Sequence, residues 1–189
     1  KICDGCPHLA KCVTDEIRTY TKRCQVVQEA PPSKVNLCKE NPKLDLLEEL
    51  LGSLLEDPDH KVIVWGLHKA ELNNIATMLN KKGWPFVRVD GSTGGNIQTL
   101  VDRFNTEPKL RVYLGQVATG VGITLNAAAY TVYSSMDWSL LTYEQSIDRN
   151  YRAGQDKKTV VYRLLAAGTI DEYKAKILEE KKNISATLT

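Results

Sequence analysis

The sequence lacks the long apolar runs of a membrane protein and the strong positive charge of a highly basic protein. No apolar run approaches the ~18 residues of a membrane-spanning helix, and no signal peptide is visible. The formal net charge is +2, too small to indicate nucleic acid as a partner, so any basic surface must come from local placement of charges. Internal repeats and low-complexity segments are also absent. With 42% hydrophobic and 25% charged residues among 189, the composition predicts a globular domain with a sizeable core.

Cysteine is absent from the last four-fifths of the chain, although it is frequent near the start. The five cysteines are Cys3, Cys6, Cys12, Cys24 and Cys38. Such clustering indicates a local metal site or a disulfide knot, and not small residues scattered through a core. A disulfide knot is not expected, because the chain is interpreted as intracellular.

Four of these thiolates have a spacing that fits a tetrahedral zinc site. Cys3 and Cys6 form a Cys-x2-Cys knuckle, and Cys12 and Cys24 complete a set of four ligands for Zn²⁺. A closed four-thiolate site has no open coordination position, so we expect a structural role. We favour zinc, but an iron–sulfur cluster uses the same thiolates and stays open as an alternative. His8 or Cys38 could also replace one ligand.

The chain divides at about residue 40 into two parts of different composition. Residues 1–40 are expected to form a cysteine-rich metal-binding element that closes with a linker-like segment at 29–34. Residues 41–189 are expected to form one larger domain, opening with Asn41-Pro42 as a helix cap and first helical residue. The first residue is Lys1 and not Met, so the chain is interpreted as a fragment of a longer protein.

Strand and helix patterns alternate through the larger part. Apolar runs predict strands at 62–65, 86–89, 111–114, 130–133 and 159–165. Apolar residues at helical spacing predict helices at 44–54, 72–79, 97–104, 141–152 and from Thr169 onward. The last helix opens with a capping box at 169–172 and is expected to bury Tyr173 and Ile177. This alternation predicts an α/β fold with a parallel sheet covered by helices on both faces.

In such a sheet, ligands bind at the carboxyl ends of the strands, so the loops after the strands are the candidate sites. The loop that starts at Gly115 contains Gly120 and Gly122, which let backbone amides approach a phosphate closely. A Gly-x-Gly loop alone is a weak signal, since many are plain turns. The segment Asp90-Gly-Ser-Thr93 is equally ambiguous, because Asp-Gly is common in turns.

The most informative segment runs from Gln145 to Gln155 and places Arg149 and Arg152 three residues apart. On a helix this spacing puts both guanidinium groups on one face, where they can converge on one target. Guanidinium is always charged and binds phosphate oxygens with two donors, which suits phosphoryl transfer. Most Arg-x-x-Arg pairs simply end a solvated helix, so the pair alone does not decide the function.

Taken in order, these segments resemble the second RecA-like lobe of superfamily two helicases, specifically of the Swi/Snf-type branch. The resemblance rests on the segments 41–44, 61–65, 89–93, 118–125, 135–139, 145–155, 161–165 and 168–172. There are departures from the family pattern. The family usually has glycine at Thr119, asparagine at Thr124 and histidine at Tyr151.

The resemblance implies roles for individual residues. Arg152 would be the arginine finger on the γ-phosphate of ATP, with Arg149 in support and Gln145 orienting the arginines or touching the nucleotide. Gly120 and Gly122 would lie against the nucleotide.

The resemblance also implies contacts with DNA. Thr119 would bind the DNA backbone, and Ser92 and Thr93 are further candidates. Simple strand-to-helix caps explain Ser92 and Thr93 equally well.

The sequence contains no Gly-x-x-x-x-Gly-Lys-Ser/Thr loop, and its acidic pairs at 15–16 and 171–172 do not follow an apolar strand. The resemblance therefore implies that ATP and Mg²⁺ are held mainly by a first lobe upstream in the same chain, and that this fragment alone is inactive.

The predicted function is that of the C-terminal motor lobe of an ATP-dependent DNA helicase or translocase. RNA stays open as an alternative partner, and no membrane is expected. The alternative function is a non-catalytic module that binds nucleic acid or protein, with a structural zinc element. The compact lobe favours a bacterial or phage source and a cytoplasmic location; a eukaryotic source would make it nuclear.

Overall fold

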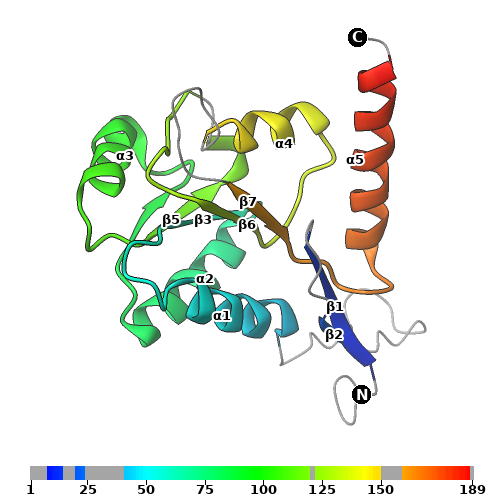
Figure 1. Cartoon of the computed structure of the whole chain (residues 1–189), viewed down its shortest axis with the longest axis horizontal. Coiled ribbons are helices and arrows are strands. Elements are labelled where there is room, and N and C mark those ends of the chain that lie inside the picture. The colour runs from blue at the N-terminus through cyan, green and yellow to red at the C-terminus, as the bar shows by residue number, and fades with distance from the viewer. Residues whose placement is uncertain (1–7, 15–19, 24–40, 120–121, 150–158, 188–189) are drawn as a thin grey trace.

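A computed structural model describes residues 8–14, 20–23, 41–119, 122–149 and 159–187. Its centre is a sheet in the order β2-β1-β7-β6-β3-β5-β4, in which the last five strands are mutually parallel. Helices α1 and α2 lie on one face of this sheet, and α3 and α4 lie on the other (Figure 1). The predicted parallel α/β fold with helices on both faces is confirmed.

The predicted strands and helices recur with small changes of boundary. The strands are β1 (His8–Thr14), β2 (Tyr20–Arg23), β3 (Val62–Gly66), β4 (Phe86–Val89), β5 (Val112–Gln116), β6 (Tyr130–Tyr133) and β7 (Val160–Arg163). The α-helices are α1 (Pro42–Leu54), α2 (Lys69–Lys82), α3 (Ile97–Thr106), α4 (Leu140–Ile147) and α5 (Ile170–Thr187). Two short 3₁₀ segments, η2 (Gly94–Asn96) and η3 (Val117–Thr119), follow β4 and β5.

The strand β3 is buried along its whole length because helices cover both of its faces. Alternate side chains point to opposite faces of a strand, so Val62 and Val64 enter one core and Ile63 and Trp65 the other. The first core is completed by α1 and α2, through leucines such as Leu47 and Leu72. A continuous apolar run is therefore required in β3, since an alternating strand would bury polar groups on one face.

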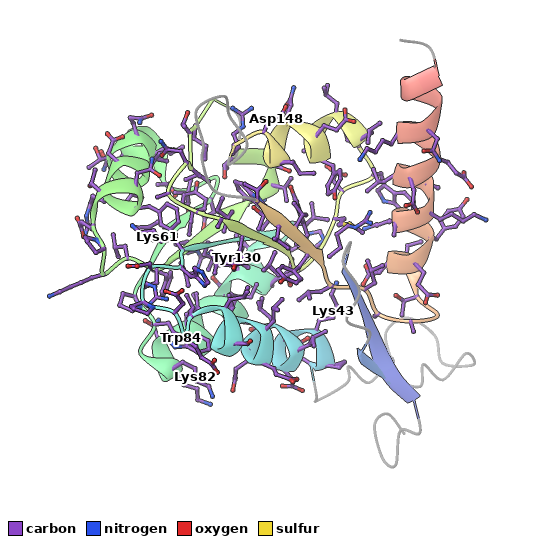
Figure 2. The ribbon with its side chains drawn as sticks, in the orientation of Figure 1. Lys43, Lys61, Lys82, Trp84, Tyr130 and Asp148 are labelled. Carbon is purple, nitrogen blue, oxygen red and sulfur yellow. The ribbon has the colours of Figure 1, made fainter. Side chains whose placement is uncertain are left out.

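The second core contains the buried aromatic side chains of Trp65, Tyr113 and Tyr133 and the inner faces of α3, α4 and α5. The ring of Tyr113 makes edge-on contacts with those of Trp65 and Phe104, each with centroids 5.6 Å apart. Lys61 holds the end of α3 against this core, because its Nζ donates to the carbonyl groups of Phe104 and Glu107 (Figure 2). Desolvation lowers the pKa of this lysine.

The start of α1 follows the sequence prediction. The Asn41 side chain accepts a hydrogen bond from the Leu44 N–H at 3.2 Å, and Pro42 occupies the first helical position. These groups satisfy a helix end that would otherwise leave its N–H groups unpaired.

The last helix, α5, departs from the sequence prediction in which face it buries. Thr169 accepts from the Asp171 N–H as expected of a cap, while Glu172 accepts from the Gly168 N–H. However, Tyr173 is 58% exposed, and Leu178 is the buried residue of this helix. The expected burial of Tyr173 is therefore wrong: its ring packs at the surface against Trp138, with centroids 6.0 Å apart. Ile177 is only half-buried.

The described part of the first 40 residues pairs with the sheet. Strand β1 runs antiparallel to β7, with Val13 opposite Arg163 and Thr14 opposite Tyr162, and β2 pairs with the outer side of β1. Of the four expected zinc ligands, Cys12 lies in β1, whereas Cys3, Cys6 and Cys24 are outside the described residues. The expected metal site thus falls mainly on residues that the structure does not describe.

None of the helices in the described ranges has both the length and the apolar character needed to cross a membrane.

Gly115 provides a test of the second core. A Cβ atom at this position would overlap the rings of Trp65 and Tyr113, both of which are fully buried. We expect Gly115→Ala to lower the free energy of unfolding by about 1–3 kcal/mol, as overpacking does in a dense core. The control Gly95→Ala, whose Cβ would meet open space, is expected to change it by less than about 0.5 kcal/mol. Urea unfolding followed by tryptophan fluorescence measures both; equal midpoints would contradict the packing described.

Candidate nucleotide and nucleic-acid site

The carboxyl ends of β6, β3, β5 and β4 meet at one edge of the sheet, and the loops that follow them are joined by side chains. Glu71, in the first turn of α2, accepts a hydrogen bond from the Leu67 N–H at 3.0 Å. Its two carboxylate oxygens also accept from the hydroxyl groups of Ser134 and Ser135, each at 2.6 Å. One carboxylate therefore fixes the loop after β3 to the loop after β6.

Gln116 continues the connection across the sheet. Its Nε2 donates to the Leu67 carbonyl at 3.0 Å, and its Oε1 accepts from the Gly91 N–H at 3.3 Å. Because β5 lies between β3 and β4, this amide links the loops that follow its two neighbouring strands. The loops at this edge are therefore connected, neighbour to neighbour, by side-chain hydrogen bonds.

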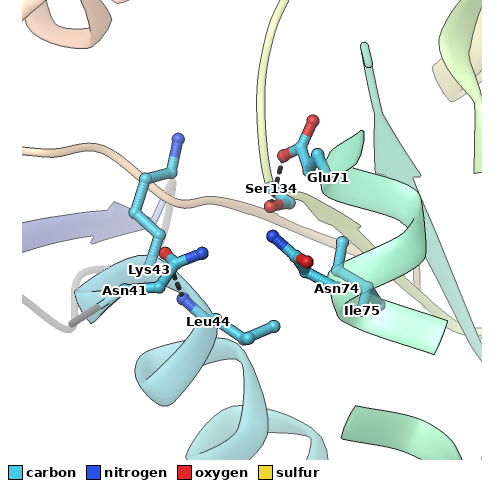
Figure 3. A pocket seen from close by; sticks show the side chains of 7 residues that line it. All are labelled: Asn41, Lys43, Leu44, Glu71, Asn74, Ile75 and Ser134. Carbon is cyan, nitrogen blue, oxygen red and sulfur yellow. Dashed lines mark hydrogen bonds between the residues drawn. The ribbon is translucent and has the colours of Figure 1, made fainter. Parts of the chain in front are cut away.

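A pocket lies beside this edge, between the start of α1 and the first turns of α2 (Figure 3). Its polar residues are largely engaged within the protein: Glu71 with Ser134, Asn41 with a backbone N–H, and Lys43 with Asp171 of α5 at 2.9 Å. We therefore assign no ligand to this pocket.

The turn after β4 is built around the buried carboxylate of Asp90. Ser92 donates to it from both its hydroxyl group and its N–H, and Arg88 forms an ion pair with it at 2.8 Å. Thr93 Oγ1 accepts from the Asp90 N–H at 2.9 Å. Ser92 and Thr93 thus bond Asp90 within the turn, and the side chain of Thr93, the N-cap of η2, makes no capping hydrogen bond.

The glycine loop, defined here as residues 119–127, follows β5 and η3. Thr119 donates its hydroxyl group to the Gln116 carbonyl at 2.7 Å. Gly122 has a φ of 83°, a conformation that side chains other than glycine adopt rarely. Beyond it, Ile123 and Leu125 are buried in the second core. Gly120 is outside the described residues.

Arg149 joins the glycine loop to the end of α4. Its carbonyl accepts from the Leu125 N–H at 2.8 Å, and its Nη1 donates to the Ile123 carbonyl at 3.3 Å. Its Nε is buried without a hydrogen-bond partner among the described residues. Two chain segments that the sequence separates are therefore held together at this point.

The helix that was predicted at 141–152 ends earlier, at Ile147. Asp148 has a ψ of −5° and turns the chain out of the helix, so Arg149 follows in a turn with its carbonyl directed at Leu125. The bond from Arg149 to the glycine loop is one that no periodic pattern reveals. Asp148 is exposed at the end of α4 (Figure 2). Gln145 is half-buried on α4, and Arg152 lies outside the described residues.

Three residues that organise this region were not predicted from the sequence: Glu71, Gln116 and Asn105. Each sits where a general rule applies, since Glu71 is an acid in the first turn of a helix and Gln116 is the last residue of a strand. Several of their partners are far away in the sequence, such as the hydroxyl groups of Ser134 and Ser135 for Glu71, and leave no local signal. Asn105 bonds the glycine loop from α3.

The described residues contain no cluster of three or more His, Cys, Asp or Glu side chains that could hold a metal ion.

The fold and its edge loops define a RecA-like α/β lobe. Residues 42–154 match the family model of the helicase conserved C-terminal domain, and the chain belongs to this family. Its relatives are Swi/Snf-type ATPases, as the sequence resemblance implied.

Three relatives show the extent of the similarity. The chain is 36% identical to "Switch 2" of Arabidopsis thaliana over 69% of its length, and 32% identical to "Chromatin-remodeling ATPase INO80" of Kluyveromyces lactis over 81%. It is 33% identical over 74% to a Xenopus laevis protein named "SWI/SNF-related matrix-associated actin-dependent regulator of chromatin subfamily A-like protein 1". It spans only 15%, 10% and 15% of these three relatives.

A solved structure agrees with this assignment. The crystal structure of the C-terminal part of the Fun30 ATPase domain matches 74% of this chain and 46% of that one, with a TM-score of 0.69 and 26% identity. The three relatives named above are eukaryotic, so they give no support to the expected bacterial or phage source.

The Asp90 turn provides a test by titration. Hydrogen bonds from the Ser92 hydroxyl and N–H, and then the contact with Arg88, lower the pKa of Asp90 from 3.8 to about 2. The ionised carboxylate therefore stabilises the fold above pH ~4, and this contribution is lost as the pH falls toward about 2. Ser92→Ala removes the largest cause and is expected to raise the pKa of Asp90.

Carbon-detected NMR titration of the carboxyl group measures this shift. Ser53→Ala, at an exposed serine of α1, is the matched control and should leave the pKa of Asp90 unchanged. An unaltered pKa in Ser92→Ala would show that the hydroxyl group does not bind the carboxylate.

Proposed function

We propose that this chain is the second motor lobe of an ATP-dependent DNA translocase, which supplies arginines to ATP bound mainly by a first lobe. The observation that carries the proposal is the double contact of Arg149 with Ile123 and Leu125 of the glycine loop. This contact holds Arg149, at the end of α4, against the loop that follows β5.

In the proposed reaction Arg152 is the arginine finger. Its guanidinium would stabilise the charge that develops on the γ-phosphate while Mg²⁺, held with the first lobe, bridges the phosphates. Arg149 would support it from its anchored position at the glycine loop. Gln145, on α4, would orient the arginines or touch the nucleotide, and Gly120 and Gly122 would admit the phosphates closely.

In the proposed nucleic-acid contact, Thr119, Ser92 and Thr93 bind the DNA backbone. Ser92 is exposed at the rim, and Thr119 lies half-exposed at the start of the glycine loop. Contacts of hydroxyl and N–H groups with phosphate carry no sequence information, which suits a motor that moves along any sequence. The same contacts do not distinguish DNA from RNA.

Movement would follow from closure of the two lobes around ATP and their reopening after hydrolysis. The names of the INO80 relative and of the Xenopus protein refer to chromatin. By this analogy we propose translocation along duplex DNA without strand separation, in a nucleus.

The cysteine cluster is proposed to hold a structural Zn²⁺ through Cys3, Cys6, Cys12 and Cys24. Four thiolates satisfy the tetrahedral preference of this ion. Since β1 contains Cys12 and pairs with β7, such a site would brace the hairpin at the edge of the sheet.

The arginine finger is tested in the full-length protein. Arg152→Ala is expected to reduce DNA-stimulated ATP turnover by about 10³-fold or more, as loss of an arginine finger does. ATP binding should be retained, because the first lobe holds most of the nucleotide. Turnover assays with and without duplex DNA, together with nucleotide-binding titrations, measure the two effects.

The control for this experiment is Arg103→Ala, which removes an exposed arginine of α3 paired with Glu107. Its turnover should match that of the wild type. Wild-type turnover in Arg152→Ala would remove Arg152 from the finger role, whereas a wild type without turnover would exclude the motor itself.

The metal site is tested by elemental analysis. Cys6→Ser is expected to release one Zn²⁺ ion per chain, because three thiolates do not complete the site. Cys38→Ser, outside the proposed ligand set, is expected to keep the ion. Iron in the purified protein would identify the cluster as iron–sulfur, and an unchanged metal content in Cys6→Ser would exclude this cysteine as a ligand.

A further inference from the structure

The glycine loop is held from a second direction by Asn105. Its Nδ2 donates to the Thr124 carbonyl at 2.8 Å, and its Oδ1 accepts from the Ala127 N–H at 3.4 Å. The two bonds use the opposite ends of one amide and reach the loop on both sides of Leu125. Arg149 bonds the same stretch at Ile123 and Leu125. The loop is therefore hydrogen-bonded both to α3 and to the end of α4.

The support beneath Asn105 is rigid. The preceding residue, Phe104, is fully buried, and Lys61 bonds the carbonyl groups of Phe104 and Glu107 on either side of it. These contacts fix the end of α3 to the start of β3. Asn105 therefore bonds the loop backbone to a helix end that is itself bonded to the start of the central strand.

Only an amide of this length makes both bonds. Aspartate keeps the acceptor for the Ala127 N–H but directs a carboxylate oxygen at the Thr124 carbonyl, and alanine loses both bonds. The loop does not depend on Asn105 for folding, because Ile123 and Leu125 anchor it in the core. What Asn105 adds is the orientation of the peptide groups between these anchors.

We propose that Asn105 is a positioning residue that couples nucleic-acid binding at the glycine loop to Arg149. The proposal rests on the proposed motor function. Asn105 fixes the backbone on both sides of Leu125, the residue that Arg149 bonds. A displacement of the loop by DNA would therefore also move Arg149. Without Asn105, the loop stays folded and bonded to Arg149 at Leu125, but the peptide groups at Thr124 and Ala127 lose their fixed orientation, so a displacement by DNA is passed on less effectively.

The test measures ATP turnover of the full-length protein against the concentration of a linear duplex DNA. Asn105→Ala and Asn105→Asp are expected to lose about fivefold to tenfold of the DNA stimulation while keeping the DNA-independent turnover. Gln98→Ala is the matched control: it removes an exposed hydrogen bond to Asp102 on the same helix and should behave as wild type.

Hydrogen exchange of the same proteins separates positioning from folding. In Asn105→Ala the Ala127 amide should exchange faster than in wild type, while the Leu125 amide, bonded to Arg149, stays protected. Wild-type DNA stimulation in both variants, or an equal loss of basal and stimulated turnover with faster exchange throughout the domain, would overturn the proposal. A wild type without DNA-stimulated turnover would refute the motor function instead, and the Ala127 amide would still report whether Asn105 holds the loop.

Discussion

The rest of the structure depends on β3, a strand that is buried on both faces and pairs in parallel with β5 and β6. Because these strands are parallel, their carboxyl ends and the loops that follow all reach one edge of the sheet. Loops gathered in this way carry many unpaired backbone groups, and Glu71 and Gln116 satisfy several of them in the order of the strands. The polar edge and the two apolar cores are therefore consequences of one topology.

Two conformationally demanding segments, the glycine loop and the end of α4, lie next to each other beside the second core. The glycine loop turns at Gly122, whose φ is positive, and its residues 122–127 form no helix or strand. Its backbone is instead bonded by Asn105 from α3 and by Arg149 from the end of α4. A loop held at both sides by side chains, and not by a strand or helix, can change position when a ligand binds while its apolar residues stay buried. This arrangement is what a lobe that links two ligands requires.

Much of the fold follows from local patterns. The buried run at 62–65, the Asn41 cap and the alternation of strands with helices all predict their elements, because burial on two faces and helix ends impose strong local rules. Prediction fails where a distant partner decides. The Arg149 carbonyl bonds Leu125, and the exposed ring of Tyr173 contacts Trp138. The role of Glu71 depends on hydroxyl groups of the loop after β6, and that of Asn105 on backbone groups of the glycine loop. The motif residues were recognisable, whereas the residues that hold them in place were not.

The central claim is that this lobe presents Arg152 to a nucleotide held by another lobe. The most direct measurement is a structure of the full-length protein with duplex DNA, ADP and beryllium fluoride. The Arg152 guanidinium is predicted to lie about 3 Å from a fluoride or phosphate oxygen. The glycine loop is predicted to contact the DNA backbone in the same complex. A closed complex in which Arg152 is remote from the nucleotide would contradict the claim.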